Sequence, residues 1–287
     1  MTNSNATTRA IAVAILLMAG APACVSAQGS GESVAMENAG ASLSYADLAA
    51  LADGTPLVVR AQVRKQARLD AEEAPGLAPG HTRLYVEART LALLSGRAPL
   101  GEKLSYLVDV PLSADGKVPK LKKREVLLFA RAVPGRPGEL QLVSPRAQIA
   151  YTPQTEARLR PILGELVAPG APAPVTGVRD ALSIPGNLAG ESETQFFLTT
   201  QSGNPVSVTV VRRPGRQPAW GVSWGEIVDQ SARPPRADTL EWYRLACFLP
   251  RSLPAGADLS TDRESQAQAQ ADYAYVLSQL GPCTRTR

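Results

Sequence analysis

The sequence predicts a mainly β protein with α-helices, built in two parts. Apolar and polar residues alternate in several segments between positions 57 and 150, which is the pattern of strands with one buried face. Proline and alanine dominate residues 168–174 (APGAPAP), a composition typical of a stiff linker. Three more strand-like segments and then two helical ones follow. We therefore expect a five-stranded β domain over 43–167 and a small α+β domain, with a three-stranded antiparallel sheet and a C-terminal helix, over 175–287.

Residues 1–27 are expected to be a secretory signal peptide. A polar start with one basic residue is followed by an apolar run, Ile11–Ala19, that is shorter than the roughly 20 residues needed to cross a bilayer core. Small residues come next, and Ala27 is the last residue before a predicted cleavage site at Gln28. The mature chain, with a flexible leader over 28–42, is then periplasmic or secreted. It contains no second long apolar stretch that would span a membrane.

Cys24 leaves a second interpretation open. If Cys24 becomes the lipidated first residue, the protein is a membrane-anchored lipoprotein, for which a role as an assembly factor is a further hypothesis. Ala21 and Pro22 depart from the usual lipobox ahead of it. Under either interpretation Cys247 and Cys283 remain, an even number in an oxidising compartment, and we expect them to form a disulfide.

The first part opens with a helix that begins at a capping box, with Ser44 as N-cap and Asp47 three residues later. Five strands are then expected in LVVRAQVRKQARL, TRLYVEARTLALL, KLSYLVDVP, EVLLFARAV and ELQLVSPRAQI. Because no helix interrupts them, they favour a meander or a closed barrel. A second helix has Thr152 as N-cap and Pro153 at its first position, and Pro161 predicts a kink or break within it.

The second part is expected to open with a short helix near 177–183. Strands are predicted in TQFFLTTQ, PVSVTVVRR and WGVSWGEIVD, and the short turns between them favour antiparallel pairing. TLEWYRLACFL predicts a helix, and a last helix is expected to begin with Ser260 as N-cap and to end at Gly281. The first turns of that helix, DRESQAQAQA, are too polar to be buried.

One helix followed by five strands with basic outer positions, with REVLLFARAVPGRPGELQLVS late in the run, resembles the OB-like barrel of secreted netrin-like and metalloprotease-inhibitor-like modules and of bacterial envelope proteins with a similar layout. The resemblance covers about residues 44–167 and implies a five-stranded OB-like barrel with flanking helices. In the inhibitor branch, an N-terminal cysteine of the mature chain chelates the protease metal. Here Gln28 is expected first and the barrel region has no cysteine, so protease inhibition is not carried over.

The charges of the chain are nearly balanced. Of 30 basic residues only Arg9 lies within 1–27, so the mature chain keeps 29 against 26 acidic residues. A nucleic-acid-binding domain normally has a much stronger basic excess on one face, so no nucleic-acid partner is expected. One histidine and two well-separated cysteines cannot assemble a tetrahedral metal site, and neither a metal nor another cofactor is predicted.

Basic residues occupy the polar positions of the first two strands. If these strands pair, one outer face carries Arg60, Arg64, Arg68, Arg83 and Arg89. OB-like barrels often bind polymers across such a face, whereas the alternative is an ordinary solvated face. The segment KVPKLKKRE, residues 117–125, is similar: its lysines would either contact anionic lipid headgroups or glycan phosphates, or guard a sheet edge.

The segment AWGVSWGEIVD holds two tryptophans four residues apart. With strand periodicity Trp220, Trp224 and Glu226 share one face, while small residues leave the other face nearly bare. The two indoles and the carboxylate would suit a sugar or a peptide, because indole offers a flat apolar surface and one N–H donor. The alternative places the tryptophans in the core, and the small residues then mark close approach by another backbone.

No catalytic constellation accompanies these features. His81 is the only histidine, and because no nucleophile turn accompanies it, a solvent-exposed or turn histidine is expected. We therefore expect a non-catalytic binding or interaction module whose partner is an envelope protein, a peptide or a glycan. The alternative is a hydrolase that acts on cell-wall or peptide substrates through carboxylates near Glu226.

Overall fold

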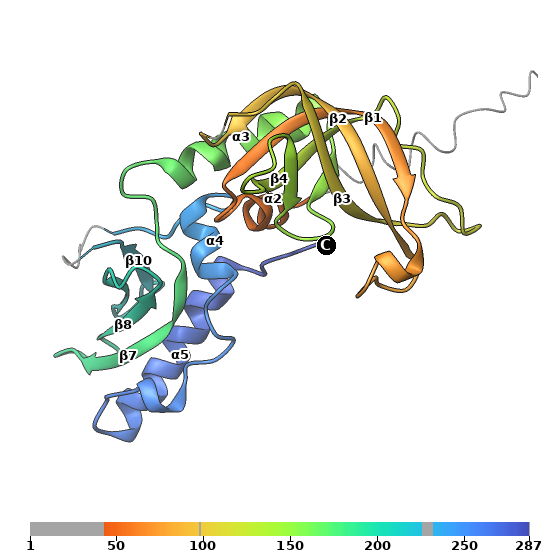
Figure 1. The fold of residues 1–287 in the computed structure, drawn as a ribbon. Coiled ribbons are helices and arrows are strands. Elements are labelled where there is room, and N and C mark those ends of the chain that lie inside the picture. Colours follow the sequence, from red (N-terminus) through yellow and green to blue (C-terminus); the bar gives the residue numbers. More distant parts are fainter. Residues whose placement is uncertain (1–42, 98, 226–231, 287) are drawn as a thin grey trace, which may run out of the picture.

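The computed structural model describes residues 43–97, 99–225 and 232–286. Figure 1 shows a β-barrel with flanking helices, which we call the barrel lobe, and a smaller sheet with one long helix, which we call the sheet lobe. The elements of the barrel lobe are α2 (Tyr45–Ala52), β1 (Leu57–Arg68), η1 (Ala71–Glu73), β2 (His81–Ser95), β3 (Lys103–Pro111), β4 (Glu125–Ala132), β5 (Glu139–Leu142), β6 (Gln148–Ala150) and α3 (Pro153–Val167). Those that follow are β7 (Val175–Pro185), β8 (Ser192–Thr200), β9 (Val206–Arg212), β10 (Ala219–Ser223), α4 (Leu240–Ala246), η2 (Ala255–Ala257) and α5 (Arg263–Leu280). The predicted fold class, mainly β with helices, is confirmed.

The first sheet closes on itself. Its strand order is β1-β2-β3-β5-β4-β6, and β1 also pairs with β4. The pairs are antiparallel except for β3 and β5, which run parallel. The circuit β1-β2-β3-β5-β4-β1 is a closed five-stranded barrel of the OB-like kind, as expected. The short strand β6 was not expected as a separate element, and it extends the sheet beyond β4.

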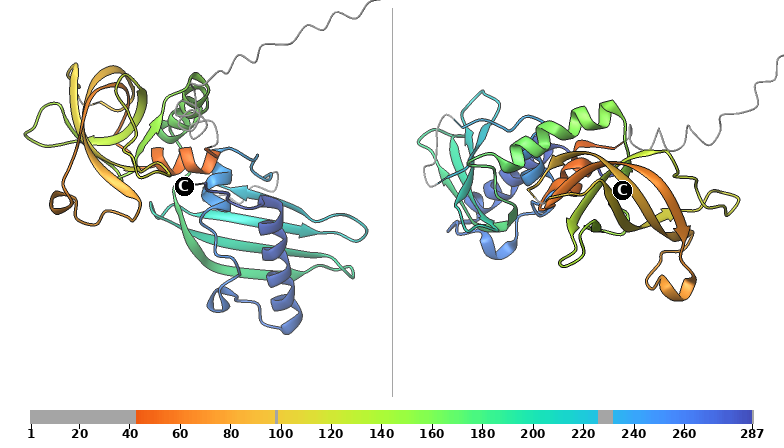
Figure 2. Two further views of the ribbon diagram at one scale, coloured as in Figure 1. Left: turned by 90° about the vertical axis from the view of Figure 1, so that its right-hand side faces the viewer. Right: turned by 45° about the horizontal axis from the view of Figure 1, so that its top comes forward.

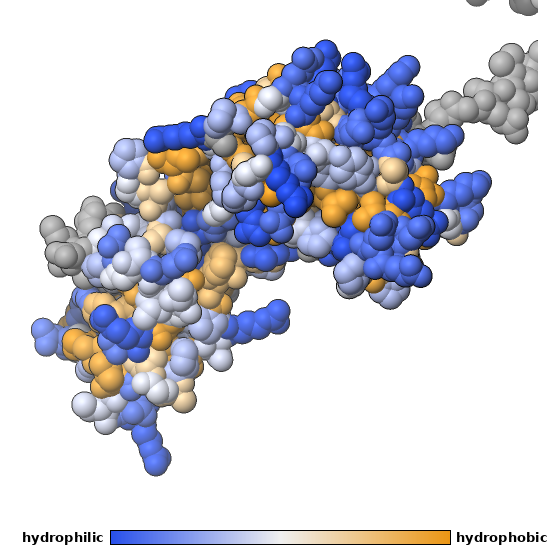
Figure 3. Space-filling view, viewed as in Figure 1, coloured by the Kyte–Doolittle hydropathy of each residue, from blue (hydrophilic) through white to orange (hydrophobic). Residues whose placement is uncertain are grey.

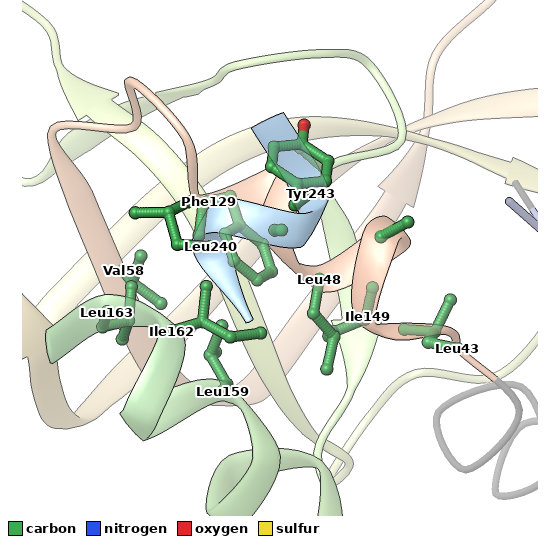
Figure 4. Close-up of a cluster of buried hydrophobic side chains, with 14 of the residues drawn as sticks. Leu43, Leu48, Val58, Phe129, Ile149, Leu159, Ile162, Leu163, Leu240 and Tyr243 are labelled. Atoms are coloured by element: carbon green, nitrogen blue, oxygen red, sulfur yellow. The ribbon is translucent and has the colours of Figure 1, made fainter. Parts of the chain in front are cut away.

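The helices close one end of the barrel. Strand residues with alternating spacing, such as Leu104, Tyr106 and Val108, fill the interior. Figure 4 shows buried side chains of α2, α3 and α4 meeting those of the strands. Its labelled members are Leu43, Leu48, Val58, Phe129, Ile149, Leu159, Ile162, Leu163, Leu240 and Tyr243. Helix α4 therefore packs into the end of the barrel although it follows the second sheet in sequence.

Both helix starts in the barrel lobe agree with the sequence. Ser44 and Asp47 form the predicted capping box, and Thr152 caps α3 by accepting a hydrogen bond from the amide of Thr155. Of the kink or break expected at Pro161, the break is wrong, because α3 continues through that residue, and the kink stays a prediction. Pro161 and Ala157, whose carbonyl loses its helical partner, are both exposed, so water can bind the freed carbonyl.

The shared basic face predicted for the first two strands is wrong in part. The β1–β2 register shifts at Arg64, which is an extra residue between Val63 and Lys65. Beyond this bulge Arg68 lies opposite Leu84, a residue of the barrel interior, rather than on the face that carries Arg60. A bulge adds one residue to one strand, which reverses the alternation that the sequence suggested.

The sheet lobe has four antiparallel strands in the order β10-β9-β8-β7, one more strand than expected. The helix predicted near 177–183 is wrong, because these residues belong to β7 and pair with β8. Valine and threonine near the start of β7 favour a strand, and pairing overrides the helix-forming Arg-Asp-Ala-Leu stretch that follows. Figure 2 shows α5 lying across one face of this sheet.

Helix α5 begins later than expected, and its first turns are buried at two positions. Asp262, not Ser260, is its N-cap and accepts a hydrogen bond from the amide of Ser265. The expectation that the first turns, residues 262–271, are too polar for burial is wrong at two positions only: Ser265 and Ala269 are buried, and the remaining residues of these turns are exposed or partly exposed. Asp272, the next residue, is also buried. The buried carboxylate of Asp272 is paired: it accepts hydrogen bonds from Arg212 at 2.6 Å and from Thr194 at 2.5 Å. A buried charge persists when it is paired in this way.

The predicted disulfide is present. Cys247 and Cys283 are joined with a Cα–Cα distance of 5.0 Å, so the end of α4 is tied to the chain beyond α5. The segment 168–174 crosses between the two sheets, and the carbonyl of Pro172 accepts a hydrogen bond from Arg244 of α4. None of the described helices is both long and apolar enough to span a membrane.

Candidate functional site

A groove of about 660 Å³ runs along the outer surface of the barrel, and we call it the barrel groove. Strands β2, β3, β4 and β5, the β4–β5 turn and the segment after β5 line it. Its lining includes Arg83, Tyr85, Tyr106, Leu107, Asp109, Arg131, Arg136, Glu139, Gln141 and Val143.

The barrel groove opens where two strands of the barrel diverge. Strands β3 and β5 are paired at only two positions, Ser105 with Glu139 and Tyr106 with Leu140. Beyond these pairs β5 follows β4, and β3 is next contacted when the amide of Asp109 donates to the carbonyl of Pro145. The groove therefore lies along the weakest seam of the barrel. In OB-like barrels this face and its neighbouring loops are where extended ligands bind.

The floor of the barrel groove is apolar and accessible. Tyr85 is 41% exposed, Leu107 is 45% exposed and Val143 is 42% exposed. These three are among the few large apolar side chains exposed in the described part of the chain, and they line one groove. Figure 3 likewise shows apolar side chains exposed between hydrophilic ones on the barrel lobe. Clustered exposed apolar residues with a polar rim mark interaction sites more often than isolated ones do.

Three arginines among the described residues line the groove. Arg83 is largely buried and donates two hydrogen bonds, of 2.6 and 2.9 Å, to the carboxylate of Asp109. These hydrogen bonds raise the pKa of Arg83. Arg136 lies 3.2 Å from Glu139. Arg131 instead donates to the neutral amide oxygen of Gln141. Of the three arginines that line the described groove, Arg131 is therefore the one whose charge is not paired with a carboxylate of the groove.

The groups in the barrel groove suit binding rather than acid–base chemistry. Both of its carboxylates, Asp109 and Glu139, are paired with arginine. The hydroxyl of Tyr106 donates to Gln148 inside the barrel, and burial raises the pKa of Tyr106. The described lining contains no histidine and no cysteine to serve as a base or a nucleophile. What the groove offers is an apolar floor with directed donors on its rim.

The arginines singled out from the sequence lie elsewhere on the barrel. Arg60 donates two hydrogen bonds to Glu125, lies 3.5 Å from Glu156 and stacks 3.8 Å over the ring of Tyr151. Arg60 thus holds the start of α3 against the barrel. Arg64 is exposed at the bulge of β1, and Arg89 lies opposite Gln62 on the neighbouring strand. A binding role for these three residues stays a prediction.

The tryptophan segment is only partly described. Trp220 is 7% exposed on the face of β10 that packs toward α5, and Trp224 is partly buried just beyond the strand. Glu226 lies outside the described residues, so its place beside the indoles stays a prediction. The close approach expected on the small-residue side is confirmed at Gly221, which lies against the backbone of Ala232 and Arg233.

The remaining candidates bring no chemistry into the described structure. His81 begins β2, and its Nδ1 lies 3.0 Å from the carbonyl oxygen of Pro79. No three His, Cys, Asp or Glu side chains of residues 43–97, 99–225 and 232–286 are grouped so that they would hold a metal ion. Cys24, Ala27 and Gln28 lie outside the described residues, so the cleavage site and the lipoprotein alternative stay predictions.

The barrel groove was missed from the sequence, although a signal for it exists. Leu107 falls on the outward phase of β3, between the inward residues Tyr106 and Val108, and Tyr85 does the same in β2. An apolar residue at an outward position of two neighbouring strands is such a signal. The convergence with Val143 requires the strand order, which the sequence did not specify. No protein family matches this chain, and no curated protein matches it either.

Proposed function

We propose that this protein is an exported, non-catalytic binding module whose barrel groove holds an extended segment of a partner protein. The observation that carries the proposal is the convergence of Tyr85, Leu107 and Val143 on one open groove beside Arg131. The partner segment would place an apolar side chain on this floor and a carboxylate against Arg131. An arginine–carboxylate contact fixes orientation, while apolar burial supplies most of the affinity.

The lining favours a peptide over a glycan. Sugars are held mainly by stacking on aromatic rings, and Tyr85 is the only exposed aromatic side chain of the described groove. Leucine and valine instead complement aliphatic side chains. The groove is also open to solvent rather than enclosed, which suits a chain segment more than a small molecule held in a closed pocket.

Export is the second half of the proposal. The apolar run of residues 11–19, the cleavage pattern before Gln28 and the Cys247–Cys283 disulfide all support a periplasmic or secreted protein. We expect the mature product recovered from the periplasm or the medium to begin at Gln28, as determined by N-terminal sequencing. A lipid-modified product beginning at Cys24 would show that the protein is a membrane-anchored lipoprotein instead. An unprocessed cytosolic product would contradict export.

Selection from a displayed library of linear peptides tests the groove directly. The full mature chain should enrich sequences that place an aliphatic residue next to aspartate or glutamate. Leu107→Asp should weaken the binding of a selected peptide by at least about tenfold, because it places a charge on the apolar floor. Arg131→Ala should weaken binding chiefly of the peptides that contain a carboxylate, measured by fluorescence polarisation.

Leu93→Asp is the matched control. Leu93 also lies on a barrel strand and is 40% exposed, but it does not line the groove. If Leu93→Asp and Leu107→Asp weaken binding equally, the groove is not the binding site. A library that yields no ligand, combined with binding of cell-wall oligosaccharides that Leu107→Asp abolishes, would overturn the peptide assignment in favour of a glycan.

A further inference from the structure

A second feature of the barrel is a row of exposed cations on the β3–β4 loop and the adjoining end of β1. We call Arg64, Lys120, Lys122 and Lys123 the basic ridge. All four are exposed, and none forms an ion pair with a described carboxylate. The neighbouring lysines Lys65 and Lys117, by contrast, pair with acidic residues at 3.0 and 2.5 Å.

The basic ridge is held rigidly. The amide of Lys123 donates to the carbonyl of Val63 at 2.8 Å, and the amide of Val63 donates to the carbonyl of Arg124 at 2.9 Å. The side chain of Gln66 binds both the amide of Leu121 and the carbonyl of Pro119. The Leu121 side chain is fully buried in the barrel core. The loop therefore pairs with β1 just ahead of the first residue of β4. Its lysine side chains lie on the solvent side.

Arg64 joins the lysines through the bulge in β1. Its guanidinium donates to the side-chain oxygen of Gln62, and the side-chain Nε2 of Gln62 donates to the carbonyl of Lys123 at 3.5 Å. The loop's backbone hydrogen bonds are explained by its covering the edge of β1. A single lysine would suffice to keep that edge from pairing with another chain, so edge protection does not account for four exposed cations. The four like charges stand on adjoining backbone segments and repel one another, and an anionic partner would relieve that repulsion.

We propose that the basic ridge docks onto a membrane surface by binding the phosphate groups of anionic phospholipids. Residues 117–124 include no aromatic side chain, whereas sites for single-stranded nucleic acid combine a basic groove with stacking rings. Each basic residue near an anionic surface adds about fivefold to binding. Four of them give a weak, reversible attachment that salt screens.

This surface and the barrel groove can be occupied together. The ridge lies at the β1–β4 junction of the barrel, and the groove lies at the β3–β5 junction. In the circuit β1-β2-β3-β5-β4 these junctions are on opposite sides. A chain docked by its ridge would present the groove away from the membrane, toward partner proteins. The proposal does not depend on the groove being functional.

Co-sedimentation of the mature chain with lipid vesicles tests the proposal. The chain should bind phosphatidylcholine vesicles that contain about one-third phosphatidylglycerol, and should not bind pure phosphatidylcholine. The triple variant K120E/K122E/K123E should bind at least about 100-fold more weakly, because three favourable charges are removed. The milder K120Q/K122Q should fall between the two, which keeps the test valid if charge reversal disturbs the fold.

The triple variant R213E/R216E/R263E changes the net charge equally but lies in the sheet lobe, and it should bind like the wild type. Equal loss in both triple variants, or equal binding by wild type and K120E/K122E/K123E, would overturn the proposal. Release by inorganic phosphate beyond that caused by sodium chloride of equal ionic strength would point to a discrete phosphate site and overturn docking on a bilayer. So would tighter binding to single-stranded DNA than to the anionic vesicles.

Discussion

Arg244 of α4 forms a two-pronged ion pair with Asp53, the residue that ends α2, across 191 positions of sequence. The side chain of Arg244 is 4% exposed and that of Asp53 is 23% exposed. The same guanidinium donates to the carbonyl of Pro172 in the segment between the sheets. One side chain thus joins three segments where the lobes meet.

Arg244→Ala should therefore lower the free energy of unfolding by about 2 to 4 kcal/mol. The loss leaves the Asp53 carboxylate and the Pro172 carbonyl without their partner, and the partial exposure of Asp53 keeps the cost below that of a fully buried pair. Urea denaturation followed by tryptophan fluorescence measures it. Arg251→Ala, at an exposed position, should change stability by less than about 0.5 kcal/mol. A similar small effect for Arg244→Ala would contradict the role of the pair.

The C-terminal tail makes a second connection, from Thr286 to Asp47. The hydroxyl and the amide of Thr286 donate to this carboxylate at 2.6 and 3.1 Å. Burial disfavours the charged form of Asp47, but hydrogen bonds from Thr286 and Ser44 outweigh it and hold the pKa of Asp47 below its usual value. Because the pKa of Asp47 is lower in the folded than in the unfolded protein, its ionised carboxylate adds to the free energy of unfolding at pH values above the unfolded-state pKa. This contribution is lost as the pH falls through the pKa of Asp47 in the folded protein.

Thr286→Val should accordingly destabilise the protein at pH 7 by about 1 kcal/mol, since it removes one hydrogen bond to a charged acceptor. The difference from wild type should shrink once the pH falls below about 4, where Asp47 takes up its proton in the unfolded chain. Thermal unfolding at a series of pH values measures this. Thr284→Val, on the same tail and without a described bond to Asp47, is the control. A difference that stays constant with pH would rule out the Asp47 contact as its cause.

The sequence predicted the barrel because its signals are local. Period-two alternation marks each strand, and Ser44, Asp47 and Thr152 cap helices within three residues of themselves. The groove and the corrected face of β1 depend instead on which strands adjoin. Nothing local to Arg64 reveals the bulge, and Leu107 meets Val143 only through the parallel β3–β5 seam. Helix α4 likewise reaches the barrel core through the path of the whole chain.

Pro161 is the clearest case in which packing overrides a local preference, because proline disfavours a helix interior and yet lies inside α3. A prediction follows from it. Leu159, Ile162 and Leu163 are buried on both sides of it in sequence, so the helix stays continuous despite the missing amide. Pro161→Ala should restore the bond to the carbonyl of Ala157 and raise the free energy of unfolding by about 1 to 2 kcal/mol, part of the helix gain being offset by a more flexible unfolded chain. Thermal unfolding checks this. A decrease would mean that the proline ring stabilises the fold by contacts of its own.

Gly221 should be the least replaceable residue of the tryptophan segment. A Cβ at this position would overlap the carbonyl group of Ala232 and lie 2.7 Å from the amide nitrogen of Arg233. These are backbone atoms, and the amide of Val222 also contacts the carbonyl of Arg233, so the crossing chain cannot move away without losing that contact.

Gly221→Ala should therefore cost about 1 to 3 kcal/mol of unfolding free energy and loosen the segment that crosses β10, seen as faster cleavage by a protease in limited digestion. Gly225→Ala serves as the matched control four residues later, because a Cβ there would have no atom of the described residues within 4 Å. If the two substitutions have the same effect on stability, the close approach at Gly221 does not constrain the fold. A large effect confined to Gly221 would instead explain why this side of β10 is built from small residues.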